Sequence, residues 1–253
     1  MKIQLIRHAT LIIFINNKRI LVDPMLSEAG FMEPIENVPN QNANPLVPLP
    51  IDVNDITNCD AVLVTHTHRD HFDEIATNLL PKYIPIFCQP EDEIKLQSYG
   101  FTDIHSIKDT YTWSNITFNR TNGKHGHDEI AVKMAPVSGF VISCSDEPSI
   151  YIAGDTVWCT EIEEAMEKFK PKIVVCNSGG AQFGYGKPIT MTTEDIYELC
   201  RRYTNIQVVA VHMEAWNHCR LSRKDLKYYI SANNITNTCL LYTSDAADEG
   251  LGV

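Results

Sequence analysis

Residues 61–73 read AVLVTHTHRDHFD, an apolar run of strand-forming residues followed at once by histidines and aspartates. Four of these side chains fall within six residues: His66, His68, Asp70 and His71. A chain that leaves a strand for a turn can direct several neighbouring side chains at one point. Imidazole and carboxylate groups are suitable ligands for divalent metals such as Zn²⁺. Ordinary capping or surface roles explain so dense a set poorly, so the stretch predicts a metal site at the end of a buried strand.

Short strands and amphipathic helices surround this stretch. The chain opens with two apolar runs, residues 11–15 and 19–23, which flank Asn16 and Asn17. Asparagine tolerates left-handed turn conformations, so we predict a β-hairpin here. Periodicity then predicts a strand, a helix, a second strand and a second helix, at residues 61–65, 73–80, 83–88 and 91–99.

The middle of the chain contains short runs that are rich in β-forming residues and separated by turn residues. We predict a β meander made of ITFNRT (116–121), EIAVKM (129–134), GFVISC (139–144) and SIYIAG (149–154).

The last third alternates strands and helices again. Thr160 and Glu163 predict a capping box that opens helix 161–170. Strand 172–176, helix 193–203 with Thr192 as its cap, strand 206–212 and a helix starting at Ser222 and Asp225 are expected to follow.

The order of elements predicts a layered α/β fold. Two βαβ-type layers flank the meander, and two packed sheets with helices outside would satisfy this order. We expect one domain over residues 1–238. The proline-rich segment 34–50 predicts a surface loop, which we expect to contribute to substrate recognition together with residues 180–191.

Composition and charge narrow the class of protein. Of the 253 residues, 44% are hydrophobic and 21% are charged, which is typical of a globular chain. The net charge of −11 disfavours general binding to nucleic acid or to anionic membranes. No signal peptide and no membrane span are apparent, and the scattered cysteines lack a C-x-x-C pair. We therefore expect a cytoplasmic protein that acts on a small molecule.

The C-terminal segment 239–253 has a different character. Its first eleven residues, CLLYTSDAADE, resemble the translation of a sequencing-library adapter. We expect this segment to be foreign to the fold and the natural C-terminus to be missing. Without it, the net charge changes from −11 to −8 because Asp245, Asp248 and Glu249 are lost. An ordinary polar terminus is the alternative.

The pattern H-x-H-x-D-H after an apolar strand resembles the signature of the metallo-β-lactamase superfamily. Further motifs follow the order of that family: LVDP with Asp23, GKHG with His125, GDT with Asp155, and AVHMEAWNH with His212. The resemblance spans residues 3–231. It is closest to the branch that includes L-ascorbate-6-phosphate lactonase and N-acylphosphatidylethanolamine phospholipase D. It implies a four-layer αβ/βα sandwich of two mixed β-sheets with helices on the outer faces.

The same resemblance implies a site for two divalent ions. Three ligands would hold one ion, three would hold the other, and one carboxylate would bridge them: His66, His68 and His125; Asp70, His71 and His212; and Asp155. Two cations lower the pKa of a shared water and polarise a carbonyl or phosphoryl oxygen. Ligation rich in histidine favours Zn²⁺, with Mn²⁺ or Fe²⁺ as alternatives. Asp23 is expected to orient a ligand imidazole instead of binding metal.

Several assignments stay open at this point. His127 lies two residues from His125 and could replace it, while Asp155 could cap the next segment and His212 could be a core histidine. We expect Asp70 and Asp155 to take part in catalysis. His8 and His218 could each line the pocket, and His218 could donate a proton to a leaving group. For His218 and His8, a hydrogen-bonded structural histidine is the alternative.

The predicted function is metal-dependent hydrolysis of a small ester, lactone or phosphodiester. Di-iron redox members of the superfamily carry a glutamate at the place of His68 and usually an attached flavin domain, and neither appears here. A nuclease-type phosphodiesterase usually brings a basic binding arm, which this acidic chain lacks. A metal-binding scaffold without activity is the remaining alternative, although all seven ligand positions carry competent side chains.

Overall fold

The computed structural model describes residues 1–240, which form two mixed β-sheets. The first sheet has six strands whose spatial order follows the chain: β1 (Lys2–Arg7), β2 (Thr10–Ile15), β3 (Lys18–Val22), β4 (Ala61–Val64), β5 (Ile86–Cys88) and β6 (Ile104–Ser106). The second sheet has seven strands, in the spatial order β13 (Thr238–Leu240), β12 (Gln207–Val211), β11 (Ile173–Asn177), β10 (Glu147–Ile152), β9 (Ser138–Cys144), β8 (Ile116–Asn122) and β7 (Thr110–Trp113).

Each sheet combines an antiparallel half with a parallel half. In the first sheet, β1 to β3 are antiparallel and β3 to β6 are parallel. In the second, β7 to β10 are antiparallel and β10 to β13 are parallel. The predicted opening hairpin is confirmed, since Asn16 and Asn17 join β2 to β3 with left-handed φ angles of 48° and 57°.

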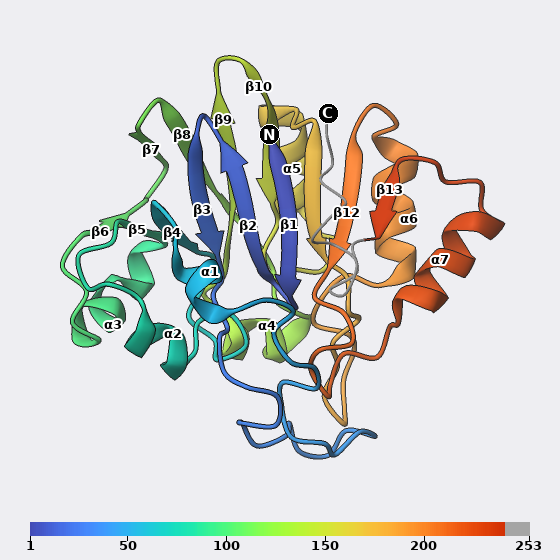
Figure 1. Ribbon diagram of the computed structural model, residues 1–253. Helices are drawn as coiled ribbons and strands as arrows, with labels where there is room; N and C mark the ends of the chain where they lie inside the picture. The colour runs from blue at the N-terminus through green and yellow to red at the C-terminus, as the bar shows by residue number, and fades with distance from the viewer. Residues whose placement is uncertain (241–253) are drawn as a thin grey trace.

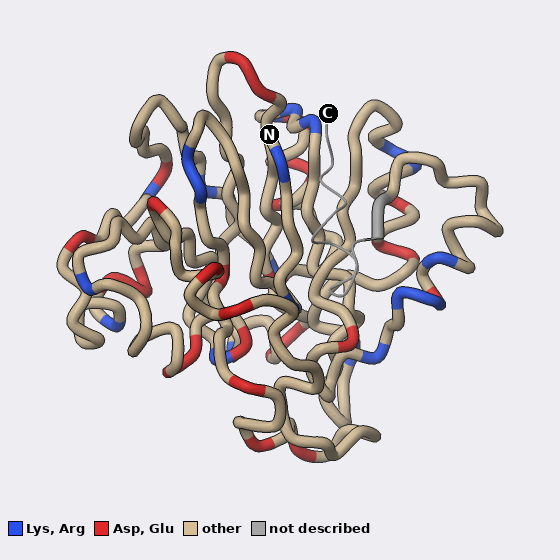
Figure 2. Tube along the Cα trace, in the orientation of Figure 1, with Lys and Arg blue, Asp and Glu red and all other residues tan. Residues whose placement is uncertain are grey.

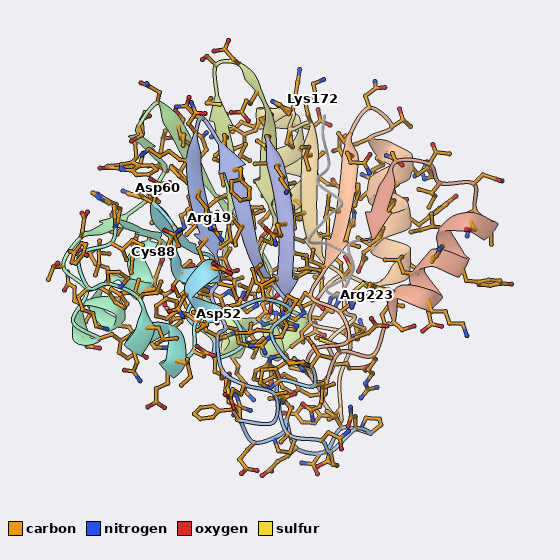
Figure 3. The ribbon with its side chains drawn as sticks, in the orientation of Figure 1. Arg19, Asp52, Asp60, Cys88, Lys172 and Arg223 are labelled. Atoms are coloured by element: carbon orange, nitrogen blue, oxygen red, sulfur yellow. The ribbon has the colours of Figure 1, made fainter. Side chains whose placement is uncertain are left out.

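Helices cover the outer faces of both sheets (Figure 1). They are α1 (Val53–Thr57), α2 (Glu74–Leu79), α3 (Glu93–Ser98), α5 (Thr160–Phe169), α6 (Thr193–Arg202) and α7 (Arg223–Ala232), with a short 3-10 helix at Pro90–Asp92. Helix α4 (Asp128–Met134) lies below the strand ends and has no buried residue. Side chains fill the space between the sheets (Figure 3).

Three apolar clusters separate four layers. Residues of both sheets, such as Leu63 and Ile152, meet in the central cluster. A second cluster packs the first sheet against α1, α2 and α3, and a third packs the second sheet against α5, α6 and α7. The predicted four-layer αβ/βα sandwich is confirmed.

Two predictions about local structure are wrong. EIAVKM (129–134) belongs to helix α4 instead of a strand, and none of its residues is buried. Thr160 lies inside α5, which begins after Cys159 without a side-chain cap, so the predicted capping box is absent. The caps predicted for the last two helices are confirmed, because Thr192 accepts from Asp195 N–H and Ser222 accepts from Asp225 N–H.

The proline-rich segment 34–50 forms a loop that folds back onto the end of the second sheet. Asn44 and Asn217, both buried, are joined by two hydrogen bonds of 2.9 Å. Asn217 also exchanges hydrogen bonds with the backbone of Ile35 and donates one to the carbonyl oxygen of Asn40. The loop is therefore fixed to the segment that carries His212 and His218.

Strand β13 includes the first two residues of the segment that the sequence predicts to be foreign, and the rest of it, 241–253, lies outside the described residues. No helix within residues 1–240 is long and apolar enough to cross a membrane. Figure 2 shows Lys and Arg positions dispersed among Asp and Glu positions along the trace.

Candidate metal centre

The predicted ligands follow the ends of strands that terminate at the same edge of the two sheets. Thr65 to His71 follow β4, His125 follows β8, Asp155 follows β10 and His212 follows β12. Most of these ligands are buried, with exposed fractions of 8% or less, while His68 is half-buried. All seven predicted ligands belong to groups whose ligand atoms lie within 4.8 Å of one another: His66, His68 and His125; His66, His71 and Asp155; and Asp70, His71 and His212 together with His8.

One group of histidines gathers on the Oδ2 side of Asp155. His66 Nε2 and His68 Nδ1 lie 2.9 Å apart, which is short enough for both to bind one ion. His125 Nε2 lies 3.3 Å from Asp155 Oδ2, and His66 Nε2 lies 4.0 Å from the same oxygen. His127 precedes α4 as its N-terminal cap residue and is absent from these groups, so the geometry favours His125 over His127.

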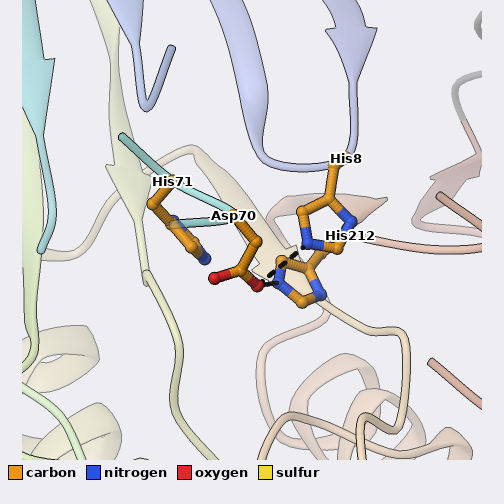
Figure 4. Close-up of side chains that lie close together, drawn as sticks. All are labelled: His8, Asp70, His71 and His212. Atoms are coloured by element: carbon orange, nitrogen blue, oxygen red, sulfur yellow. Dashed lines mark hydrogen bonds and ion pairs between the residues drawn. The ribbon is translucent and has the colours of Figure 1, made fainter. Parts of the chain in front are cut away.

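A second group gathers on the Oδ1 side of Asp155. Figure 4 shows its members His71, Asp70 and His212 close together. His71 Nε2 and His212 Nε2 lie 3.3 Å and 3.4 Å from Asp155 Oδ1. Asp70 Oδ2 lies 3.5 Å from His212 Nε2. The two oxygens of Asp155 therefore face different groups of ligands.

These spacings fit metal ions. Bonds of about 2.0–2.1 Å in a tetrahedral site place neighbouring ligand atoms about 3.3–3.4 Å apart, and the distances from Asp155 to His71, His125 and His212 match this value. Among the residues that the structure describes, His71 Nε2 and His212 Nε2 are buried without a hydrogen-bond partner. Buried polar atoms of this kind require an explanation, and coordination of a cation supplies one.

The ligand imidazoles are oriented through their other ring nitrogens. His71 Nδ1 donates to Asp23 Oδ2 at 2.8 Å, so Asp23 lies where the sequence predicts an orienting carboxylate. Asp23 also accepts from the backbone N–H and the hydroxyl of Thr65, each at 2.7 Å. His125 Nδ1 donates to the carbonyl oxygen of Ile189 at 2.8 Å.

The electrostatics keep the carboxylates ionised. Burial acts to raise the pKa of Asp155, but the charges of His212, His71 and His125 outweigh it and hold the pKa well below its usual value. Burial likewise opposes ionisation of Asp70, and the adjacent imidazoles of His212 and His8 overcome it and lower its pKa.

The imidazoles divide into two classes. Burial and then neighbouring imidazoles lower the pKa of His66, and burial lowers that of His68, so both rings are neutral and able to bind metal. Burial opposes protonation of His71 too, but Asp155 and Asp23 raise its pKa to about 10. Metal binding at His71 would therefore displace a proton.

Two residues of the site escaped the sequence analysis. Asn177 ends β11, and its Nδ2 donates to Asp155 Oδ1 at 2.6 Å. Cys219 Sγ lies 3.6 Å from His212 Nδ1. The position of Asn177 could have been predicted from the sequence, because it ends an apolar strand. This strand runs parallel to the strand that precedes Asp155.

The weaker candidates also lie near the centre. His218 is buried beside Trp216 and Phe183, with ring centroids 6.1 Å and 6.2 Å away. Burial lowers the pKa of His218 to about 4. Trp158 instead packs against the cluster between the second sheet and its helices.

A cavity of about 660 Å³ adjoins the half-buried His68. Its walls include Phe31, Met32, Phe72 and Tyr99, and Arg69 also lines it. Small-molecule sites commonly have volumes of roughly 300–1,000 Å³, and this cavity lies within that range. Charged residues such as Asp73 and Lys95 line it beside the apolar ones.

Comparisons with known proteins agree with this geometry. The family model described as Beta-lactamase superfamily domain matches residues 18–213. The UPF0173 protein YddR of Bacillus subtilis is 37% identical, over 95% of this chain and 96% of that protein.

Two solved structures have nearly the same fold. A possible metal-dependent hydrolase from Veillonella parvula has a TM-score of 0.93 and 35% identity, over 97% of this chain and 98% of that chain. An isothiocyanate hydrolase from Delia radicum gut bacteria has a TM-score of 0.93 and 34% identity, over 99% of this chain and all of that chain. The narrower resemblance to the lactonase and phospholipase branch stays a prediction. The chain belongs to the beta-lactamase superfamily domain family, and its relatives there include metal-dependent hydrolases.

Proposed function

We propose that this protein hydrolyses a small molecule with two divalent metal ions held by His66, His68 and His125, by Asp70, His71 and His212, and by a bridging Asp155. The observation that carries the proposal is the position of Asp155. Its Oδ2 faces His125 at 3.3 Å, and its Oδ1 faces His71 and His212 at 3.3 Å and 3.4 Å. A carboxylate in this position can bind one ion through each oxygen.

The ions, when bound, would lower the pKa of a shared water to supply hydroxide and would stabilise negative charge that develops on the substrate. The chain's own residues supply the geometry. Asn177 and Asp23 hold Asp155 and His71 in place, and the cavity beside His68 offers room for a substrate. Zn²⁺ suits this ligand set, and Mn²⁺ or Fe²⁺ would also bind to it.

Two classes of substrate fit such a site. Esters, lactones and phosphodiesters each present a carbonyl carbon or a phosphorus to hydroxide. An isothiocyanate presents the electrophilic carbon of its N=C=S group, and the 34% identity to an isothiocyanate hydrolase over the whole chain favours testing it. Addition of water across C=N would give a thiocarbamate, which releases carbonyl sulfide and leaves the amine.

The test combines metal counting with a substrate panel. Metal-free protein is loaded with Zn²⁺ or Mn²⁺, the bound metal is counted by mass spectrometry, and lactone, ester, phosphodiester and isothiocyanate substrates are assayed. We expect two ions per chain and turnover of at least one class.

Asp155→Asn keeps the shape of the side chain but removes its charge, so we expect bound metal to fall and hydrolysis to be lost. Asp146→Asn, at an exposed position, is the control and should behave as the wild type. Wild-type turnover by Asp155→Asn would refute the bridging role. Metal binding without turnover of any substrate in the panel would favour the inactive scaffold.

A further inference from the structure

His8, whose role the sequence leaves open, lies beside the proposed ligands. It follows β1 in the turn before β2, it is 1% exposed, and its φ angle of 60° is left-handed. Its ligand atom lies within 4.8 Å of those of Asp70, His71 and His212. Proximity alone permits two roles: a further metal ligand, or a residue that positions the ligands.

Ring spacing distinguishes these roles. Two imidazoles that bind one ion through bonds of about 2.0–2.1 Å point away from that ion, so their ring centres are roughly 4.5 Å or more apart at bond angles of 90° or above. His71 and His212 fit this requirement, with centroids 5.3 Å apart. The rings of His8 and His212 lie only 3.5 Å apart and are tilted by 36°. This spacing is that of a stacking contact and is too short for two ligands of one ion.

His8 also makes two hydrogen bonds to proposed ligands, and Figure 4 shows the one from its side chain to Asp70. Its Nε2 lies 3.3 Å from Asp70 Oδ2, and because an ionised carboxylate only accepts, His8 is the donor. Its backbone carbonyl oxygen accepts the N–H of His212 at 2.9 Å. A single residue thus contacts the ring and backbone of one ligand and the carboxylate of another.

We infer that His8 is a positioning residue that holds Asp70 and His212 in their metal-binding orientations and does not itself bind the ion. This inference rests on the proposed metal centre. It predicts that the side chain of His8 affects the affinity of the centre and leaves the number of bound ions unchanged.

The test uses variants of His8 that separate its ring stacking on His212 from its hydrogen bond to Asp70. His8→Phe keeps a ring to stack on His212 but loses the hydrogen bond to Asp70, whereas His8→Gln keeps an N–H donor close to the position of Nε2. His105→Phe is the control, because His105 lies on β6 and stacks on Tyr111 instead of the metal centre. Metal-free full-length proteins are titrated with Co²⁺, followed by visible absorption, and bound cobalt is counted by mass spectrometry.

We expect every variant to bind two Co²⁺ at saturation with the band positions of the wild type. His8→Phe should bind the more weakly held ion roughly 10–100-fold less tightly, as is usual when a group that orients a ligand is lost. His8→Gln should recover part of that loss, and His105→Phe should match the wild type.

Other outcomes overturn the inference. Loss of one ion at saturation, or a spectrum that indicates one nitrogen ligand fewer, would make His8 a ligand. If His8→Phe bound Co²⁺ as tightly as the wild type, His8 would not be a positioning residue. Circular dichroism checks folding, and His8→Asn, whose amide is too short to reach Asp70, replaces His8→Phe if that variant does not fold. Fewer than two ions on the wild type would instead refute the proposed centre.

Discussion

Three residues of the centre have left-handed backbones. His8, Asp23 and His212 have φ angles of 60°, 44° and 61°, and each directly follows the last residue of a strand. Such conformations cost about 1–3 kcal/mol in residues other than glycine and persist only where surrounding contacts hold them. Here they turn three side chains from strand ends toward one point. The strain is therefore linked to the assembly of the site.

The environment of His218 leads to a prediction about catalysis. Because its pKa is lowered to about 4 by burial, its ring is neutral at pH 7 and can donate one N–H hydrogen bond to a substrate oxygen. We expect His218→Ala to retain both metal ions and to reduce kcat roughly 10²–10³-fold, as loss of one such donor does. Steady-state kinetics and metal counting test this.

The pH profile gives a second measure of the same residue. A group that must be neutral is fully active above its pKa, so His218 should leave kcat constant between pH 5 and 8. His105→Ala serves as the control. Loss of metal in His218→Ala would instead make His218 a ligand.

The sequence points to the proposed ligands of this centre more directly than to the residues that support them. His66, His68, Asp70 and His71 are close in sequence, so one strand end suffices to bring them together. Asn177, by contrast, acts through a hydrogen bond to Asp155 that depends on the alignment of β10 with β11. An asparagine at the end of a strand has many possible partners, and only the three-dimensional arrangement selects one.

At the level of elements, the two threonines that the sequence predicts to cap helices provide a matched pair. Thr192 accepts from Asp195 N–H at the start of α6, whereas Thr160 lies within α5 and makes no cap. We expect Thr192→Ala to lower the free energy of unfolding by about 1 kcal/mol, which corresponds to a decrease of roughly 2–4 °C in Tm. Thr160→Ala should change Tm less. Equal decreases in thermal unfolding would contradict the structural distinction.

Helix α4 shows where periodicity fails. Ile130, Val132 and Met134 alternate with other residues, and this pattern is typical of a half-buried strand. In the fold no residue of α4 is buried, and Val132 is 78% exposed. The alternation therefore predicts a buried face that α4 does not have. The buried strands β4, β11 and β12 were predicted correctly, because burial on both faces leaves a continuous apolar run.

The loop over residues 31–44 connects the cavity beside His68 to Asn217. Phe31 and Met32 line the cavity beside His68, and Asn217 holds the same loop through Ile35, Asn40 and Asn44. We expect Asn217→Ala to raise KM several-fold and to lower the free energy of unfolding by about 1–3 kcal/mol, because buried partners lose their hydrogen bonds.

Metal content should not change in Asn217→Ala, since Asn217 contacts none of the proposed ligands in the described hydrogen bonds. Asn42→Ala, at an exposed position in the same loop, is the matched control. If KM were unchanged in Asn217→Ala, this loop would not take part in substrate binding.

At the scale of the whole molecule, the proposed ligands come from both sheets. His66, His68, Asp70 and His71 follow a strand of the first sheet, while His125, Asp155 and His212 follow strands of the second. The central apolar cluster holds the sheets together along their length. At the edge where the strands end, buried imidazoles and carboxylates replace apolar contacts, so bound ions would cross-link the two sheets there.

Removal of metal should therefore destabilise the whole domain. An ion present at about 1,000 times its Kd adds roughly 4 kcal/mol to the free energy of unfolding, which for a domain of this size corresponds to an increase of about 8–16 °C in Tm. We expect a chelator to lower the Tm of the wild type by that order and added Zn²⁺ to restore it. Asp155→Asn, which lacks the bridging charge, should start at a lower Tm and respond much less to either treatment. If mass spectrometry showed complete removal of both ions from the wild type with no change in Tm, the ions could not cross-link the sheets, because a ligand that binds only the folded state must stabilise it.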